Sequence, residues 1–218
     1  MIDEPVAAAI GASLPVTEPV GTMIVDIGGG TTEVAVLSLG GTVVSESLRI
    51  AGDEINDSIS SYLKKKHSMA VGERTAEKIK IKIGSAFPDD NFDNTSFEVR
   101  GLHLSSGLPR SITLTSGEVR EAMADPLNKI VDAIKRTLER TPPELAADIV
   151  ERGIMLAGGG ALIRGINDLI TKETGIFTHL AEDPLLCVVN GCGEILDDFR
   201  KIKRIVDTID VGTSSVRN

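Results

Sequence analysis

The chain has 218 residues, of which 41% are hydrophobic and 25% are charged, as in ordinary globular proteins. Lys and Arg number 23 against 32 Asp and Glu, so the net charge is −9, and we expect no binding to nucleic acid, whose phosphates such a surface repels. Its two cysteines exclude a disulfide scaffold and suit a reducing cytoplasm, and no apolar run approaches the ~20 residues of a transmembrane helix.

The first quarter of the chain predicts a helix and a three-stranded meander. The helix spans 4–12, and because a chain seldom starts on a helix boundary, we expect that another segment normally precedes it. An apolar, β-branched run at 22–27 and two alternating segments at 32–38 and 42–50 predict strands. The short turns between these strands indicate antiparallel pairing.

The middle of the chain predicts helices around a pair of strands. Apolar residues four apart favour a helix over 52–66. The segment 73–83 alternates in part like a strand, but its good helix formers and the glycine that follows favour a helix. Strands are expected near 97–103 and 110–115, followed by a long helix to about residue 140 with Ser116 as its N-cap.

The last third of the chain alternates helices and strands, which predicts an α/β fold. A proline pair at 142–143 breaks the long helix, and a short helix follows. The further elements expected are, in order, a buried strand at 153–157, a glycine turn, a helix at 161–172, a strand at 176–180, a helix at about 184–199 and a helical tail at 200–210.

The strongest candidate site lies in the segment VDIGGGTTEVAV, which begins at residue 25. A strand there ends in Asp26, whose carboxylate is suited to hold Mg²⁺ through water. Glycines let backbone N–H groups approach an anion closely, and threonines add hydroxyl groups. The residues concerned are Gly28, Gly29, Gly30, Thr31 and Thr32. The same pattern fits a tight hairpin whose glycines serve only the backbone, and composition leaves both interpretations open.

A second run of three glycines, Gly158, Gly159 and Gly160, follows the predicted strand at 153–157. The N-terminus of the helix predicted after it offers free N–H groups and a partial positive charge. The run is neither a Walker A loop nor a dinucleotide-binding fingerprint, and a tight strand-to-helix turn is the plain alternative. Two such strand–glycine elements in one chain are harder to explain as simple turns than either element would be alone.

Other polar residues carry weaker signals. Glu4 lies at the start of the first predicted helix, where a carboxylate is usually a cap. Glu77 and Lys80 lie three apart on one helix face, which usually indicates a surface ion pair. The three histidines have no metal-ligand spacing, and no Ser-His-Asp or Cys-His arrangement is evident.

Several blocks of the sequence resemble the MreB family, the rod-shape-determining bacterial actins. They include VDIGGGTTEVAVLSLG, GERTAEKIKIKIGSAFP and TPPELAADIVERGIMLAGGGALIRG, in family order, and the resemblance runs from residue 1 to about 200. It implies an α/β, actin-like ATPase fold with two ribonuclease-H-like domains around an ATP cleft. This chain resembles the second domain, with a core of 1–52 and 116–185, a small inserted subdomain of 53–115, and C-terminal helices in 186–218 that would pack on the first domain.

The resemblance also implies a role for each candidate residue. Asp26 would face Mg²⁺ through water, and Glu4 with Thr31 would place the water that attacks ATP. Glu77 and Lys80 would flank the adenosine. Gly28, Gly29, Gly30, Thr31 and Thr32 would hold phosphates, and Gly158, Gly159, Gly160 and Ala161 would line the base.

At the level of the cell, the resemblance implies a cytoplasmic filament protein that sets rod shape. Its partners would be further protomers, a membrane adaptor of the RodZ type and the cell-wall elongation machinery, through which it would reach the membrane. The family's first phosphate loop, an Asp-x-Gly-Thr element near the family's N-terminus, is expected to have no counterpart in this chain, and the same is expected of the family's membrane anchor in the first domain. We therefore expect neither ATP turnover by this chain alone nor direct membrane binding.

Two other classes of function stay open at this point. One is an enzyme of the same superfold, such as a sugar or acetate kinase or an Hsp70-type ATPase. A kinase would need a second acid or base beside Glu4, and none is evident. The other is a non-catalytic interaction module, which the missing phosphate loop favours.

Overall fold

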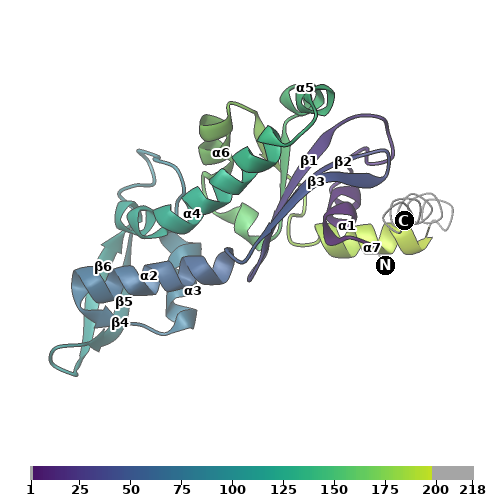
Figure 1. The fold of residues 1–218 in the computed structure, drawn as a ribbon. Helices are drawn as coiled ribbons and strands as arrows, with labels where there is room; N and C mark the ends of the chain where they lie inside the picture. Colours follow the sequence, from purple (N-terminus) through teal and green to yellow (C-terminus); the bar gives the residue numbers. More distant parts are fainter. Residues whose placement is uncertain (1, 198–218) are drawn as a thin grey trace, which may run out of the picture.

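Two β-sheets organise residues 2–197, the part of the chain that this computed structural model describes (Figure 1). The larger sheet has the strand order β3-β2-β1-β7-β8. Its strands are β1 (Thr22–Ile27), β2 (Thr32–Ser38), β3 (Gly41–Leu48), β7 (Ile154–Ala157) and β8 (Thr178–Leu180). The first three strands pair antiparallel, as predicted, whereas β7 lies parallel to both β1 and β8.

Helices cover both faces of the larger sheet (Figure 1). Val25 and Ile27 pack into the main hydrophobic cluster on one face, whereas Ile24 packs on the opposite face. This alternation buries the whole of β1, as a central strand between two helical layers requires. The helices are α4 (Ser116–Glu139), α5 (Pro143–Arg152) and α6 (Ile166–Thr174) on the first face, and α1 (Glu4–Gly11) and α7 (Cys187–Asp197) on the second.

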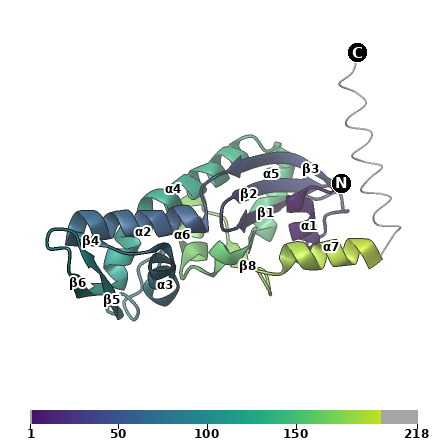
Figure 2. The same ribbon diagram turned by 90° about the horizontal axis from the view of Figure 1, so that it is seen from below.

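The helices α1 and α7 cross at two glycines, although they lie at opposite ends of the described chain (Figure 2). A Cβ atom on Gly11 would overlap the carbonyl oxygen of Cys187, and one on Gly191 would overlap that of Ala7. The two backbones therefore approach more closely than side chains at these positions would permit. This contact fixes α1, and with it Glu4, against the sheet.

The smaller sheet has the order β4-β5-β6, with antiparallel pairing throughout. Together with two helices it forms what we call the small subdomain. Its elements are α2 (Gly52–His67), β4 (Met69–Ala70), α3 (Glu73–Ile83), β5 (Ser96–His103) and β6 (Pro109–Thr115). Leu63, Ile79 and Leu114 belong to the same hydrophobic cluster as Val25 of the larger sheet, so one core joins the two sheets.

Several boundaries differ from the prediction. The long helix α4 begins after Thr115, which is its N-cap in place of Ser116 and forms a capping box with Glu118. The prediction that a helix starts at residue 161 is wrong. A 3-10 turn, η1 (Gly159–Leu162), comes first, and the helix α6 begins only at Ile166. The short strand β4 was not expected. The helical tail predicted at 200–210 lies outside the described residues.

Candidate functional site

The candidate site forms where β1 and β7 end. These two parallel strands pair Asp26 with Ala157. Because the carboxyl ends of parallel strands meet at one edge of a sheet, the two glycine runs that follow them lie side by side. The fold therefore unites two motifs that are far apart in the sequence.

The second glycine run passes against β1 with no room for side chains. Gly158 has a φ of +80°, and a Cβ atom there would overlap Oδ1 of Asp26 and the carbonyl oxygen of Ile27. A Cβ atom on Gly160 would overlap the Ile27 side chain. Close approach of the backbone therefore requires glycine at both positions.

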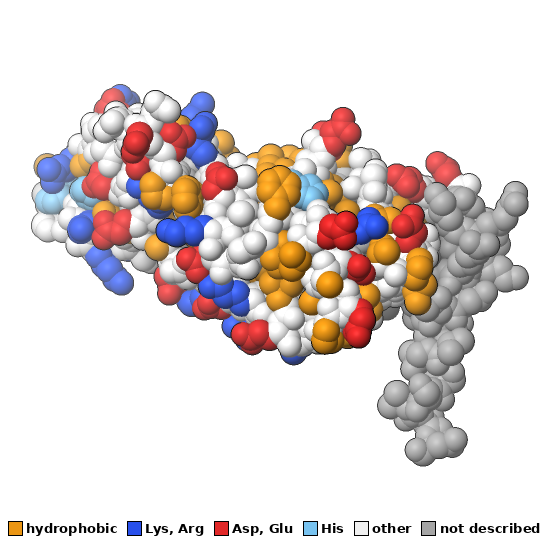
Figure 3. Space-filling model, turned by 90° about the horizontal axis from the view of Figure 1, so that it is seen from above, with side chains coloured by type: hydrophobic (Ala, Val, Ile, Leu, Met, Phe, Trp, Pro, Cys, Tyr) orange, Lys and Arg blue, Asp and Glu red, His pale blue; other side chains and the backbone are white. Residues whose placement is uncertain are grey.

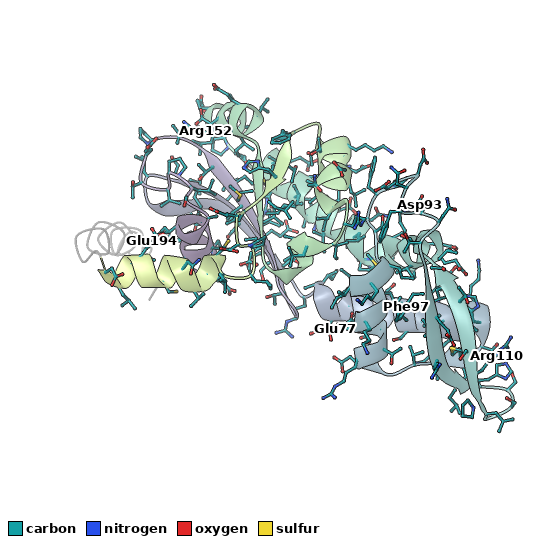
Figure 4. The ribbon with its side chains drawn as sticks, turned by 180° about the vertical axis from the view of Figure 1, so that it is seen from behind. Glu77, Asp93, Phe97, Arg110, Arg152 and Glu194 are labelled. Carbon is teal, nitrogen blue, oxygen red and sulfur yellow. The ribbon has the colours of Figure 1, made fainter. Side chains whose placement is uncertain are left out.

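A cleft of about 670 Å³ lies between these turns and the small subdomain. It collects residues from α1, β1, both glycine runs and α3, and Figure 4 shows Glu77 on α3 beside the junction of the two parts. The predicted site residues that line the cleft are Glu4, Asp26, Gly28, Gly29, Glu77, Lys80, Gly158, Gly159 and Gly160.

The structure does not bring four predicted residues into this lining. Gly30 and Thr31 are exposed at the turn between β1 and β2. Thr32 is fully buried, and its hydroxyl donates a hydrogen bond of 2.7 Å to the carbonyl oxygen of Ile50. Ala161 is buried beneath the cleft. The glycine run thus reaches the cleft, whereas the Thr32 hydroxyl is used within the fold.

Asp26 is the most perturbed carboxyl group of the site. Its side chain is only 7% exposed, and burial together with repulsion from Glu4 and Glu33 raises its pKa to about 6. All three causes disfavour the negative charge, so the site holds more carboxylate charge than its own residues neutralise. A divalent cation would relieve this excess.

Lys80 supplies positive charge to the same cleft. Its ammonium group donates a hydrogen bond of 2.9 Å to the carbonyl oxygen of Gly52. Burial lowers its pKa, against the opposing attraction of Glu77 and Asp53. A partly buried lysine held in this way presents a fixed cation to a ligand.

Part of the lining is apolar. Ile81, Leu162 and Leu185 are large hydrophobic residues that are more than half exposed, and all three face the cleft. Within residues 2–197, no cluster of three or more metal-ligating side chains is present, and no helix is long and apolar enough to cross a bilayer. The cleft therefore combines an anionic and glycine-rich part with an apolar part.

A model of the MreB/Mbl protein family matches residues 1–204. The chain belongs to this family. It is 53% identical to the cell shape-determining protein MreB of Escherichia coli (strain K12) over 197 residues, which are 90% of this chain and 56% of that protein. It is 46% identical to the cell shape-determining protein Mbl of Bacillus subtilis (strain 168), covering 93% of this chain and 60% of that protein. The chain thus spans less than two thirds of these relatives.

Solved structures place the chain within the actin-like ATPase fold that the sequence predicted. MreB5 of Spiroplasma citri bound to ADP has a TM-score of 0.88 and 38% identity, covering 94% of this chain and 61% of that chain. A MamK double helical filament has a TM-score of 0.71 at 20% identity, covering 90% of this chain and 59% of that chain, and this likeness shows the fold alone. The predicted MreB resemblance and fold class are confirmed.

The prediction missed Gly52 and Asp53, which also line the cleft. The Gly52 N–H donates to the Gly28 carbonyl oxygen at 3.1 Å, and the Asp53 N–H donates to that of Gly29 at 2.8 Å. These bonds dock the start of α2 on the first glycine run. The sequence did point to these two residues, because the segment RIAGDEI, residues 49–55, is a further block that resembles the MreB family.

One further sequence match was missed. The tetrapeptide Asp210-Val211-Gly212-Thr213 has the Asp-x-Gly-Thr pattern of the family's first phosphate loop, although it stands near the C-terminus. Four residues make a weak motif. It lies outside the described residues.

Proposed function

We propose that this chain is the nucleotide-binding second half of an MreB/Mbl-type actin, which binds ATP with Mg²⁺ and takes part in filaments that determine cell shape. One observation carries the proposal: Glu4, Asp26, Lys80 and both glycine runs, from four separate parts of the sequence, line a single cleft. The relatives are cell shape-determining proteins, and MreB5 binds ADP and AMPPNP in its solved structures.

In this proposal the first glycine run holds the phosphates. The backbone N–H groups of Gly29 and Gly30, with Thr31, would donate to phosphate oxygens, and no Cβ limits the approach of the two glycines. Gly28, whose own N–H donates to the Thr31 carbonyl oxygen at 2.9 Å, would shape the turn around the phosphates. Asp26 would hold Mg²⁺ through water, and the excess carboxylate charge around it fits that cation. When bound, Mg²⁺ would supply positive charge to the phosphates of the nucleotide.

Glu4 is proposed to orient the attacking water together with Thr31. It stands at the N-terminus of α1, which the crossing with α7 holds against the sheet. A carboxylate is too weak a base to deprotonate bulk water, so the role of Glu4 is positional. Thr31 is exposed beside the cleft, from where its hydroxyl is free to meet a bound water.

Glu77 and Lys80 are proposed to flank the adenosine, and Gly158, Gly159, Gly160 and Ala161 to border its base. Ala161 would act through the backbone, since it is buried. The predicted division into a core of 1–52 and 116–185 and an insert of 53–115 is kept as part of this proposal. The cleft then lies at the boundary of the two subdomains.

We further propose that the chain associates with copies of itself and reaches the membrane from the cytoplasm through a RodZ-type adaptor and the cell-wall machinery. Direct affinity for lipid should be absent, because the chain carries a net charge of −9. Lys and Arg side chains gather mainly over the small subdomain in Figure 3. Flotation with anionic liposomes and no adaptor is the check.

Ligand-observed NMR tests the nucleotide site at the millimolar concentrations that weak binding needs. Saturation should transfer from the protein to ATP in the presence of Mg²⁺. Lys80→Ala should weaken this signal, whereas Lys78→Ala, on an exposed position of α3 outside the cleft, should not. Absence of transfer to ATP, or equal signals from both variants, would instead favour a non-catalytic interaction module.

A further inference from the structure

The loop between α3 and β5 places one phenylalanine in the cleft. Phe92 is half-buried, and it is the sole aromatic residue in the cleft lining within the described part of the chain. The guanidinium carbon of Arg164, which also lines the cleft, lies 3.9 Å from the centre of the Phe92 ring. This separation is that of a cation stacked on an aromatic face.

The stack is held from both sides. Arg164 is fixed through its backbone, because its carbonyl oxygen accepts a hydrogen bond of 2.7 Å from the Ala86 N–H and it forms a β-bridge with Ser85. The Phe92 loop is fixed by the next residue, because Asp93 forms a bidentate ion pair with Arg120 of α4. Preorganised planar groups lose little entropy when a ligand stacks on them.

Arg164 meets the Phe92 ring without a competing ion pair in the described part of the chain. Among residues 2–197, no carboxylate lies within ion-pair distance of its guanidinium group. The neighbouring lining is apolar, with Ile81 and Leu162 exposed into the cleft. A flat π surface beside apolar side chains is suited to a nucleobase, and the planar guanidinium group of Arg164 extends that surface.

We propose that Phe92 and Arg164 form a stacking wall for the nucleobase, and that they bind the base of the nucleotide in addition to the residues assigned above. This inference rests on the proposed nucleotide site. The pair spans the boundary between the small subdomain and the core, because Phe92 precedes β5 and Arg164 precedes α6. A stacked base therefore ties the two subdomains together at the mouth of the cleft.

The experiment uses the complete 218-residue chain, which contains no tryptophan. Phe92→Trp introduces a single tryptophan at the proposed wall, and its emission should be quenched by ATP and not by inorganic tripolyphosphate. Phe177→Trp is the matched control, because Phe177 is exposed and lies outside the cleft lining. Its emission should respond to neither ligand.

Affinity gives a second measurement. Phe92→Ala should weaken ATP binding about fivefold to a hundredfold, the usual effect of removing one stacked aromatic, and should leave tripolyphosphate binding unchanged. Equal ATP affinities of Phe92→Ala and the unmodified chain, without quenching in Phe92→Trp, would overturn the stacking wall while nucleotide binding stands. Failure of the unmodified chain to bind ATP at all would overturn both proposals.

Discussion

Asp26 shows how the burial of a single carboxyl group can oppose stability. Its folded-state pKa of about 6 lies above the ordinary value of 3.8, so the folded chain holds this proton more tightly than the unfolded chain. The stabilising contribution is therefore fully present below about pH 3.8 and is lost as the pH rises through about 6. We expect Asp26→Asn to raise the free energy of unfolding at pH 7 by about 1–3 kcal/mol.

Urea unfolding from pH 4 to pH 8 measures this effect. The gain in free energy of unfolding that Asp26→Asn shows over the unmodified chain should be close to zero near pH 4 and should grow between pH 4 and pH 7. If Asp26 holds Mg²⁺, adding that ion should stabilise the unmodified chain and so reduce the difference in free energy of unfolding between it and Asp26→Asn at pH 7. If the two proteins differed in free energy of unfolding by the same amount at every pH, the difference would not come from the ionisation of Asp26.

Glu4 offers a separate test of chemistry. In a protein made by joining this chain to the first half of an MreB, Glu4→Ala should abolish ATP turnover and largely spare ATP binding, because a residue that positions water acts on catalysis alone. Asp3→Ala, at an exposed neighbour outside the cleft, should leave both intact. Phosphate release and calorimetry on the joined protein separate the two effects; equal loss of binding would reject the role.

At the scale of elements, the start of α4 is decided by its cap. The Thr115 side chain accepts a bond from the Glu118 N–H, while the Ser116 hydroxyl is buried without a partner. Thr115→Ala should therefore cost about 1 kcal/mol of stability, and Ser116→Ala should be neutral or stabilising. Thermal unfolding of the two variants compares them, and the reverse order would restore Ser116 as the cap.

At the scale of the whole molecule, the proposed function gives this chain one side of a nucleotide cleft. The loss of two or three phosphate hydrogen bonds, at ~1.5–3 kcal/mol each, would cost about 3–9 kcal/mol. At 1.4 kcal/mol per tenfold, ATP affinity should be weaker than ~100 μM, with negligible hydrolysis. Calorimetry decides this. If binding were micromolar, a chain shortened to residues 1–205 would show whether the segment at 210–213 supplies the missing contacts.

Assembly should be weak for a related reason. The cost of association entropy is the same for a small interface as for a large one, so the loss of half an interface removes most of the net affinity. We expect the purified chain to remain largely in the supernatant after high-speed sedimentation with ATP and Mg²⁺. Abundant long filaments in the pellet would contradict this expectation.

Local sequence patterns predicted most helices and strands, and also the candidate site residues at the ends of these elements. The strand that contains Asp26 has clear ends, because a glycine stands on each side of its apolar run. The segment α3 is a helix because the burial of Ile79 and Ile83 follows helical spacing. Two outcomes needed tertiary information. The Thr32 hydroxyl donates its hydrogen bond to Ile50 inside the fold, and Phe92 reaches the cleft from a polar loop that carries no motif.

The crossing of α1 and α7 at Gly11 and Gly191 sets an order for events during synthesis. The buried face of α1 includes Val6 and Ala9, and it shares its hydrophobic cluster with Cys187, which is made almost last among the described residues. A ribosome has therefore released nearly the whole described chain before α1 can find its partner. Glu4 travels with α1, so an incomplete nascent chain has no finished cleft in which to hold a nucleotide.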